Sequence, residues 1–141
     1  MKFKRILCGV DFSQTSVKAF EAAVELTRSF KAELHVIHVI EVEPVLPDLS
    51  LEEKALAAMD ALISPATGDG SDVRITTEVT TGSASGEILA RAHERKVDLI
   101  AIGTKGLTLL EEGIFGGTAK RVFSGAPCSV LAVREGNRRT G

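Results

Sequence analysis

Tryptophan and tyrosine are both absent from the sequence, which has 141 residues and only six phenylalanines. Aromatic side chains are the usual platforms on which proteins stack nucleobases. The composition therefore gives little support for a protein that binds single-stranded nucleic acid or shields a flavin. Cysteine is nearly lacking too, since Cys8 and Cys128 are the only two and lie outside any CxxC pattern. We expect both to be small buried apolar residues without a metal or redox role.

An excess of charge of either sign is also missing. The 17 Lys and Arg residues and the 19 Asp and Glu residues give a formal net charge of −2, so neither a nucleic acid nor a membrane is an expected partner. No apolar run is long enough to cross a bilayer, and the first one ends at Asp11, too early for a secretion signal. We therefore expect a cytoplasmic protein with one domain over residues 1–141 and a frayed tail after about residue 135.

Short apolar runs alternate with segments of helical periodicity along the whole chain. Continuous apolar runs between polar turns are typical of strands that are buried on both faces, whereas the polar–apolar alternation of the third segment predicts an edge strand. The expected strands are Ile6–Val10, Leu34–Ile40, Val73–Val79, Asp98–Gly103 and Ser129–Val133.

Four helices are expected between these strands. Ser13, Thr15 and Ser16 offer N-caps for the first. The segment Ser50–Glu53 predicts a capping box at the start of the second, and Pro65 predicts the end of that helix. The buried stripe of the second helix is expected to be Leu51, Ala55, Met59 and Leu62, the third helix contains Ile88–Ala92, and the fourth covers Thr118–Phe123.

Strict alternation of strands and helices predicts an α/β fold, with a doubly wound parallel sheet of five strands in the order 3-2-1-4-5 and helices on both faces. Such sheets bind ligands beyond the carboxyl ends of their strands, where the strand order reverses. This switch point lies between the first and fourth strands, from which the loops after Gly9-Val10-Asp11 and Ile102-Gly103 leave.

Glycine, by contrast, is concentrated in residues 103–122, which hold five of the 13 glycines. Gly116-Gly117-Thr118 comes just before the last expected helix, where backbone N–H groups suit a phosphate. Gly103 and Gly106 bracket a turn that carries Lys105, which is either a phosphate contact or a solvated loop charge. These glycines could equally be turn and cap residues alone, and Gly113 has no role that we can derive.

The sequence resembles the universal stress protein family. Nucleotide-binding members of that family show the pattern G-x2-G-x9-G-[S/T], and Gly103, Gly106 and Gly116 stand at this spacing. Four further segments, KRILCGVDFSQTS, HVIHVIE, TTGSASGEIL and APCSVLAVRE, resemble in order the family's first strand and loop, its second strand, the start of its third helix and its last strand. The resemblance extends over essentially the whole chain.

The resemblance implies that ATP, or ADP or AMP, binds at the switch point, with Mg²⁺ as an accompanying ion. It implies that Asp11 contacts the adenine, that Val39 lines the adenine pocket, and that the last strand, Ser129–Val133, pairs two subunits into a homodimer. From the residues alone, Asp11 could instead be a cap or loop carboxylate. The expected binding residues are Gly9, Val10, Asp11, Val39, Ile102, Gly103, Lys105, Gly106, Gly116, Gly117 and Thr118.

One position departs from the family pattern, because Gly117 stands where the pattern has Ser or Thr. The backbone N–H groups of Gly117 and Thr118 could still hold a phosphate, and the Thr118 hydroxyl lies one residue further on. Two hypotheses follow. The first is a regulatory, ATP-binding stress-response homodimer with at most slow hydrolysis, since no dedicated base is evident. The alternative is a homologue that binds no nucleotide and acts as a dimeric interaction module.

Other enzyme and signalling classes lack their signatures. The chain has no Walker A, GxGxxG, HxGH or SGGxDS sequence, and its third strand does not end in a phospho-acceptor aspartate. Of the three histidines, His38 is expected to be a satisfied core residue, whereas His35 and His93 have no evident partners.

Overall fold

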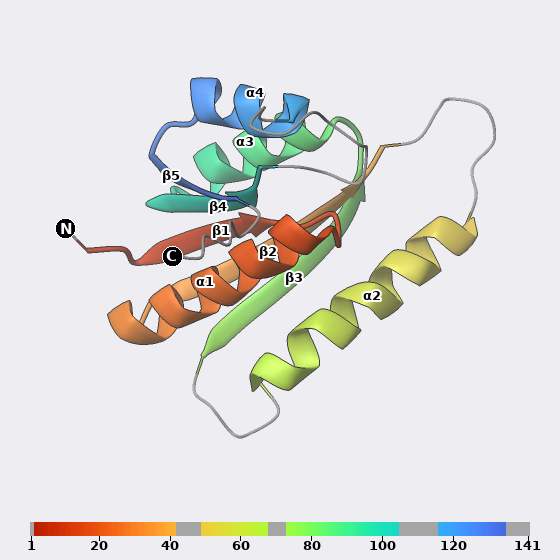
Figure 1. The fold of residues 1–141 in the computed structure, drawn as a ribbon, viewed down its shortest axis with the longest axis horizontal. Coiled ribbons are helices and arrows are strands. Elements are labelled where there is room, and N and C mark those ends of the chain that lie inside the picture. Colours follow the sequence, from red (N-terminus) through yellow and green to blue (C-terminus); the bar gives the residue numbers. More distant parts are fainter. Residues whose placement is uncertain (1, 42–48, 68–72, 105–115, 135–141) are drawn as a thin grey trace, which may run out of the picture.

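One sheet of five parallel strands forms the centre of the computed structural model, which describes residues 2–41, 49–67, 73–104 and 116–134 (Figure 1). The strands are β1 Arg5–Gly9, β2 Glu33–Ile40, β3 Arg74–Thr81, β4 Leu99–Gly103 and β5 Ser129–Val133. Their order is β3-β2-β1-β4-β5, and each neighbouring pair is parallel. The expected fold class and strand order are thus confirmed, with β3 at one edge and the switch point between β1 and β4.

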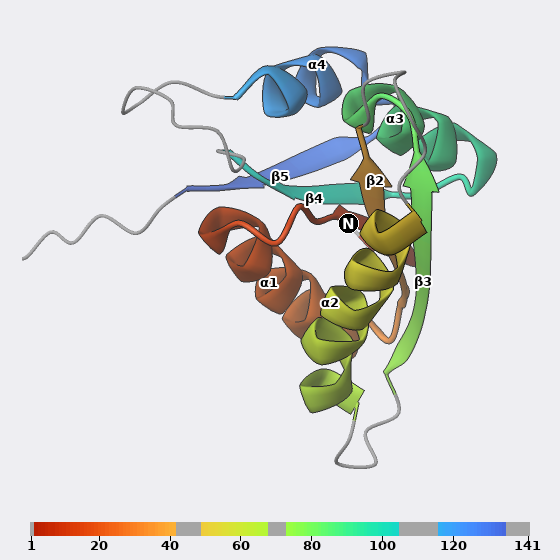
Figure 2. The same ribbon diagram turned by 90° about the vertical axis from the view of Figure 1, so that its right-hand side faces the viewer.

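Two helices cover each face of the sheet, with α1 and α2 on one side and α3 and α4 on the other (Figure 2). The helices are α1 Gln14–Phe30, α2 Leu49–Thr67, α3 Ala84–Glu94 and α4 Gly117–Gly125. Successive strand residues point to opposite faces. Ile6 and Cys8 of β1 therefore pack beneath α1 and α2, whereas Leu7 packs beneath α3 and α4. Both faces being covered explains why the central strands are continuously apolar.

The start of α1 follows directly from its sequence. Ser13 is the N-cap, with extended backbone angles, and its side chain accepts a hydrogen bond from the Ser16 N–H. Of the three capping candidates only Ser13 serves, and Thr15 and Ser16 lie buried inside the helix. This cap fixes the point at which the chain leaves β1 and enters α1.

The start of α2 differs from the expectation. The helix already begins at Leu49, so Ser50 has a helical backbone and does not act as the N-cap of a capping box. Ala55 and Met59 are buried as expected, but Leu51 is 38% exposed. Leu51 lies in the first turn of α2, which projects away from the sheet (Figure 1), so no strand covers this part of the stripe.

The end of α2 differs as well, because the helix continues through Pro65 to Thr67. Proline removes one backbone donor but is compatible with the helical φ. Other contacts stabilise this last turn. The Arg28 guanidinium donates to the Ala66 carbonyl at 3.1 Å, and Ile63 and Ala66 pack against the core. These long-range contacts offset the lost hydrogen bond.

A polar cluster joins β2, β3 and α3 on the face that α3 covers. His35 is buried, with Nδ1 2.6 Å from the Thr76 hydroxyl and Nε2 2.9 Å from a Glu78 carboxylate oxygen. Arg91 Nη2 donates to Glu78 at 2.6 Å. His35 therefore has partners, contrary to the expectation, and these lie 41 and 43 residues away along the chain. Only the pairing of β2 with β3 brings them together.

The charges of this cluster predict a loss of stability in acid. Arg91 holds the pKa of Glu78 at about 2, and burial lowers the pKa of His35 from 6.5. The unfolded chain therefore binds more protons than the folded one, first at His35 as pH falls below about 6.5, and then at Glu78 as pH falls from about 4.5 towards 2. The free energy of unfolding in urea should decrease over both windows.

Substituting the histidines one at a time distinguishes the pH range in which His35 takes up a proton from the range in which Glu78 does. His35→Gln should flatten the fall that begins below about pH 6.5 while leaving the more acidic fall in place. His93 is exposed on α3, so His93→Gln serves as the matched control and should leave the profile unchanged. Equal profiles for the parent and His35→Gln would contradict the assignment.

Candidate functional site

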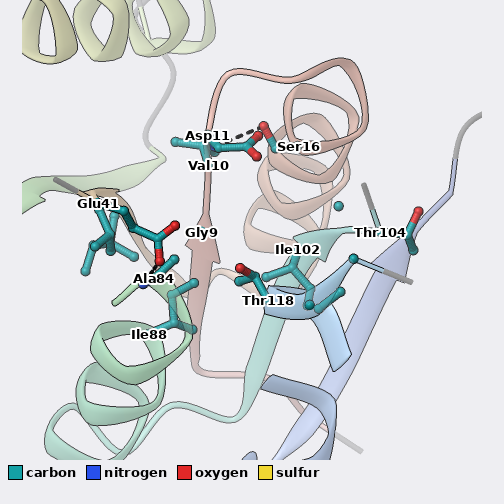
Figure 3. Close-up of a pocket in the computed structure, with 16 residues that line it drawn as sticks. Gly9, Val10, Asp11, Ser16, Glu41, Ala84, Ile88, Ile102, Thr104 and Thr118 are labelled. Atoms are coloured by element: carbon teal, nitrogen blue, oxygen red, sulfur yellow. Dashed lines mark hydrogen bonds between the residues drawn. The ribbon is translucent and has the colours of Figure 1, made fainter. Parts of the chain in front are cut away.

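A cavity of about 150 Å³ lies where the carboxyl ends of β1, β2 and β4 meet the N-termini of α3 and α4 (Figure 3). This is the switch point of the sheet. Of the expected binding residues, Lys105 and Gly106 lie outside the described part of the chain, as does Gly113. The remaining nine all line the cavity, namely Gly9, Val10, Asp11, Val39, Ile102, Gly103, Gly116, Gly117 and Thr118.

The floor of the cavity is apolar. Val39 at the end of β2 and Ile102 at the end of β4 are buried there, and Ile88 of α3 packs between the strand ends. Gly9 makes this packing possible, because a Cβ at that position would lie only 2.7 Å from Ile88 Cδ1. The floor can therefore accept a flat apolar group such as a base.

Asp11 brings a carboxylate to the rim of this floor. Its Oδ1 accepts hydrogen bonds from both the backbone N–H and the hydroxyl of Ser13, and its own N–H donates to the Ser16 hydroxyl at 3.2 Å (Figure 3). No hydrogen bond within the described part of the chain uses Oδ2. Asp11 is thus a loop carboxylate beside the true N-cap, and one of its oxygens is available as an acceptor.

The N-termini of α3 and α4 both reach the cavity. They differ in the hydrogen-bond acceptors that their first backbone N–H groups have. At α3, the Ser83 hydroxyl accepts from the Gly86 N–H, and the Glu41 carboxylate accepts from the Ala84 N–H at 2.9 Å. At α4, the N-cap is Gly116, which has no side chain to cap the helix. The positive end of α3 is therefore neutralised by a carboxylate, whereas no side chain in the described part of the chain caps the first N–H groups of α4, where an anion is favoured.

Gly117 is the first residue of α4, and none of its described neighbours demands a glycine there. Among the described residues, the atoms nearest to a Cβ built on it are at the tip of the Arg121 side chain, 3.4 Å away at Nη1, and its φ is not positive. The absent hydroxyl is therefore not a steric necessity. Arg121, which we did not anticipate as a site residue, brings a guanidinium close to this N-terminus from one helical turn away.

Several residues that line the cavity are not among the binding residues expected from the sequence. Ile37 and Glu41 could have been found, because they lie two residues on either side of Val39 and so share its face. Thr104 directly follows β4, whereas the other four come from the N-terminal halves of helices and cannot be derived from the strand pattern. The missed lining residues are Ser16, Ile37, Glu41, Ala84, Ile88, Thr104 and Ala119.

Other kinds of site find little support in the part of the chain that the structure describes. No three or more His, Cys, Asp and Glu side chains there are grouped so as to hold a metal ion. Burial raises the pKa of the Cys8 thiol to about 12 and also raises that of Cys128, so both stay protonated at neutral pH. None of the described helices is long and apolar enough for a membrane span.

Comparison with known proteins gives consistent results. The universal stress protein family model matches residues 2–134. The universal stress protein MJ0531 of Methanocaldococcus jannaschii is 33% identical over 144 residues, which cover 94% of this chain and 83% of that protein. The solved structure of the protein MJ0577 is 26% identical, covers 98% of this chain and all of that one, and superposes with a TM-score of 0.85.

Two more distant structures of the same fold contain nucleotides. One is a universal stress protein in complex with cAMP, with a TM-score of 0.72, 18% identity and coverage of 94% of this chain and 98% of that one. The other, from Archaeoglobus fulgidus, is in complex with dAMP, with a TM-score of 0.70, 18% identity and coverage of 94% and 99%. The family match over nearly the whole length, the strand order and the relatives agree, and the chain belongs to the universal stress protein family.

Proposed function

We propose that this protein binds an adenine nucleotide, foremost ATP, in the cavity at the switch point and acts as a regulatory protein of the stress response. The observation that carries the proposal is the pairing of an apolar floor with an uncapped helix N-terminus in one cavity. A nucleotide needs both, one for the base and one for the phosphates. Nucleotide complexes of the same fold support this reading.

Each end of the nucleotide has a matching set of residues in this proposal. The adenine would lie on the floor near Val39, with its amino group donating to Asp11 Oδ2. The phosphates would accept from the backbone N–H groups of Gly117 and Thr118, with Lys105 and Gly106 as further expected contacts. Glu41 already neutralises α3, so α4 is the favoured end for the negative charge.

Magnesium fits this arrangement only as a companion of the nucleotide. Mg²⁺ in nucleotide sites is commonly held by substrate phosphates and water rather than by an all-protein cage. The described residues form no acidic cluster near α4, which agrees with that mode. Among the described lining residues, Asp11 and Glu41 already accept hydrogen bonds from backbone N–H groups and neither is a dedicated base for activating water, so we propose binding with at most slow hydrolysis.

Calorimetric titration tests the proposal directly. ATP, with and without Mg²⁺, should bind one site per chain, and ADP and AMP should bind in the same cavity. Mass spectrometry of small molecules released from freshly purified, denatured protein would identify a nucleotide that co-purifies. If neither method detects an adenine nucleotide, the alternative of a dimeric interaction module without a nucleotide becomes the better account.

Replacing Gly117 with serine should strengthen ATP binding. A Cβ fits at this position, and the added hydroxyl would donate to the phosphate from the first turn of α4, which suggests a gain of roughly 1 kcal/mol, or about fivefold in Kd. Adenosine should bind the parent and Gly117→Ser equally, since it lacks phosphates. Gly117→Ala is the matched control without a hydroxyl. An equal ATP affinity in all three proteins would argue against a phosphate at this position.

We also propose that the protein forms a homodimer through β5. This strand is at the edge of the sheet, and its residues 130–133 are only partly buried. The carbonyl of Val133 faces β4, where it accepts from the Thr104 N–H at 3.0 Å. The backbone groups of Ala132 therefore face the open edge, where a second copy could pair with them.

A proline on this edge should prevent the pairing. Ala132→Pro removes an outward N–H without removing a donor to β4, so we expect the sedimentation coefficient of a monomer, against that of a dimer for the parent. Ala132→Ser keeps the N–H and should remain dimeric. A dimer that persists in Ala132→Pro would show that β5 is not the interface.

A further inference from the structure

Phe12 has an unusual backbone conformation between the cavity and α1. Its φ is 66°, in the left-handed region, which is unfavourable for a bulky side chain. The residue lies between Asp11, at the rim of the cavity, and the N-cap Ser13. A conformation of this kind persists only where the surroundings hold it in place, and it is often found next to functional groups.

His38 of β2 provides that support. Its ring centroid lies 4.7 Å from that of Phe12, with an angle of 42° between the rings. Its Nδ1 lies 2.7 Å from the Val10 carbonyl oxygen. Because a carbonyl can only accept, Nδ1 must carry the proton. Both contacts come from one side chain, and they fall on the residues immediately before and after Asp11.

Val10 is therefore anchored twice to β2, one residue beyond the end of β1. Its N–H donates to the Ile37 carbonyl at 2.9 Å, and its own carbonyl accepts from His38. Phe12 is anchored by its ring. The backbone of Asp11 is thus fixed on both sides, while Ser13 holds its Oδ1, which leaves Oδ2 with a defined direction.

We infer that Phe12 and His38, called here the Phe12–His38 pair, are positioning residues that set the base specificity of the site by holding Asp11. The inference rests on the proposed nucleotide binding and extends it to the choice of base. Among the described residues, neither member of the pair lines the cavity, so both act through Asp11. The site would prefer purine nucleotides that carry an amino group at position 6 of the base over those that carry an oxo group there.

The affinity ratio of ATP to ITP is the appropriate measure, because the two differ at position 6 of the base. An ionised acceptor that loses its donor forfeits a charged hydrogen bond, so the parent should prefer ATP by about tenfold or more. Asp11→Asn is the reference variant. Its amide oxygen can still accept from Ser13, which turns the NH₂ group towards the base and should reverse the preference.

Variants of the pair then show whether it acts through Asp11. His38→Leu removes the donor to Val10, and Phe12→Gly removes the ring while adopting the left-handed backbone without strain. Both should bring the ratio close to one. His38→Asn keeps a donor near the position of Nδ1 and should retain most of the preference. Met59→Ala, at a buried position of α2 that does not line the cavity, controls for a general loss of stability and should retain the parental ratio.

The outcomes separate this inference from the proposal on which it rests. A parental ratio in both His38→Leu and Phe12→Gly, together with a reversed ratio in Asp11→Asn, would overturn the role of the pair and leave nucleotide binding by Asp11 intact. A fall of the ratio in Met59→Ala equal to that in His38→Leu would also overturn it. An unchanged ratio in Asp11→Asn would overturn the inference and the contact of Asp11 with the base, and absence of ATP binding in the parent would overturn the proposed function as well.

Discussion

Replacing Gly103 with alanine is expected to destabilise the protein by about 3 kcal/mol, the upper part of the usual range for overpacking. A Cβ on Gly103 would clash with Thr15 Oγ1 and would lie 2.7 Å from both the Ser16 nitrogen and the Thr15 carbonyl carbon. Two of these three atoms are backbone, so the first turn of α1 as a whole would have to move away from β4.

Urea unfolding of the Gly103→Ala protein measures this effect. Gly86→Ala, in the first turn of α3, is the matched control, because its Cβ would meet only the Ser83 side chain at 3.5 Å and beyond. That variant should be as stable as the parent or slightly more so, since alanine favours a helix over glycine. Equal stability of Gly103→Ala and the parent would contradict the close contact between α1 and β4.

The position matters because this contact brings the loop of Asp11 to the end of β4. Gly103 is the first glycine of the family pattern, and from the sequence it is expected to end the fourth strand, begin the turn after it and belong to the binding residues. The structure adds a packing reason, since α1 and β4 touch at this residue. A variant that folds with α1 displaced should consequently bind nucleotide more weakly as well.

Gly117→Asp is expected to weaken ATP binding by about 100-fold or more while leaving adenosine binding unchanged. The new carboxylate would occupy the place of the phosphate at the start of α4, and juxtaposed like charges cost several kcal/mol. The fold should tolerate it well, because the Cβ has room and an acidic side chain in the first helical turn is favourable. Loss of binding would therefore not reflect unfolding.

Gly117→Asn is the matched control for this experiment. It has nearly the same shape and no charge, so it should bind ATP within a few fold of the parent. Calorimetric titration of all three proteins with ATP and with adenosine gives the comparison. If Gly117→Asp retained the ATP affinity of the parent, the phosphates would have to lie elsewhere.

The fold could be predicted well from the sequence, because each buried strand is a continuous apolar run and strict alternation with helices leaves few topologies. The errors fall where a long-range contact overrides a local signal. Pro65 is a strong local stop, but Arg28 and the core stabilise the turn around it. The partners of His35 come from another strand, and no local pattern identifies them.

In the candidate site, too, some residues follow from local sequence patterns and others depend on contacts between distant segments. Residues at strand ends, such as Val39 and Ile102, follow from the sheet order alone. The place of Glu41 beside the cavity follows from its spacing to Val39, but its hydrogen bond to the start of α3, 43 residues further along the chain, does not. Likewise, the sequence marked Gly117 as a departure from the family pattern but could not say whether a side chain would fit there. Whether a side chain fits at position 117 depends on where the Arg121 side chain lies, which only the structure gives.

The placement of the nucleotide is tested most directly by an NMR titration that follows the backbone amides of the ¹⁵N-labelled protein with ATP and with adenosine. Binding of the base on the floor and of the phosphates at α4 predicts that both ligands shift the amides of Asp11 and Val39, and that only ATP also shifts those of Gly117 and Thr118. If ATP left the amides of Gly117 and Thr118 unshifted at saturation, or shifted no amide of the cavity, the nucleotide would not bind in this way.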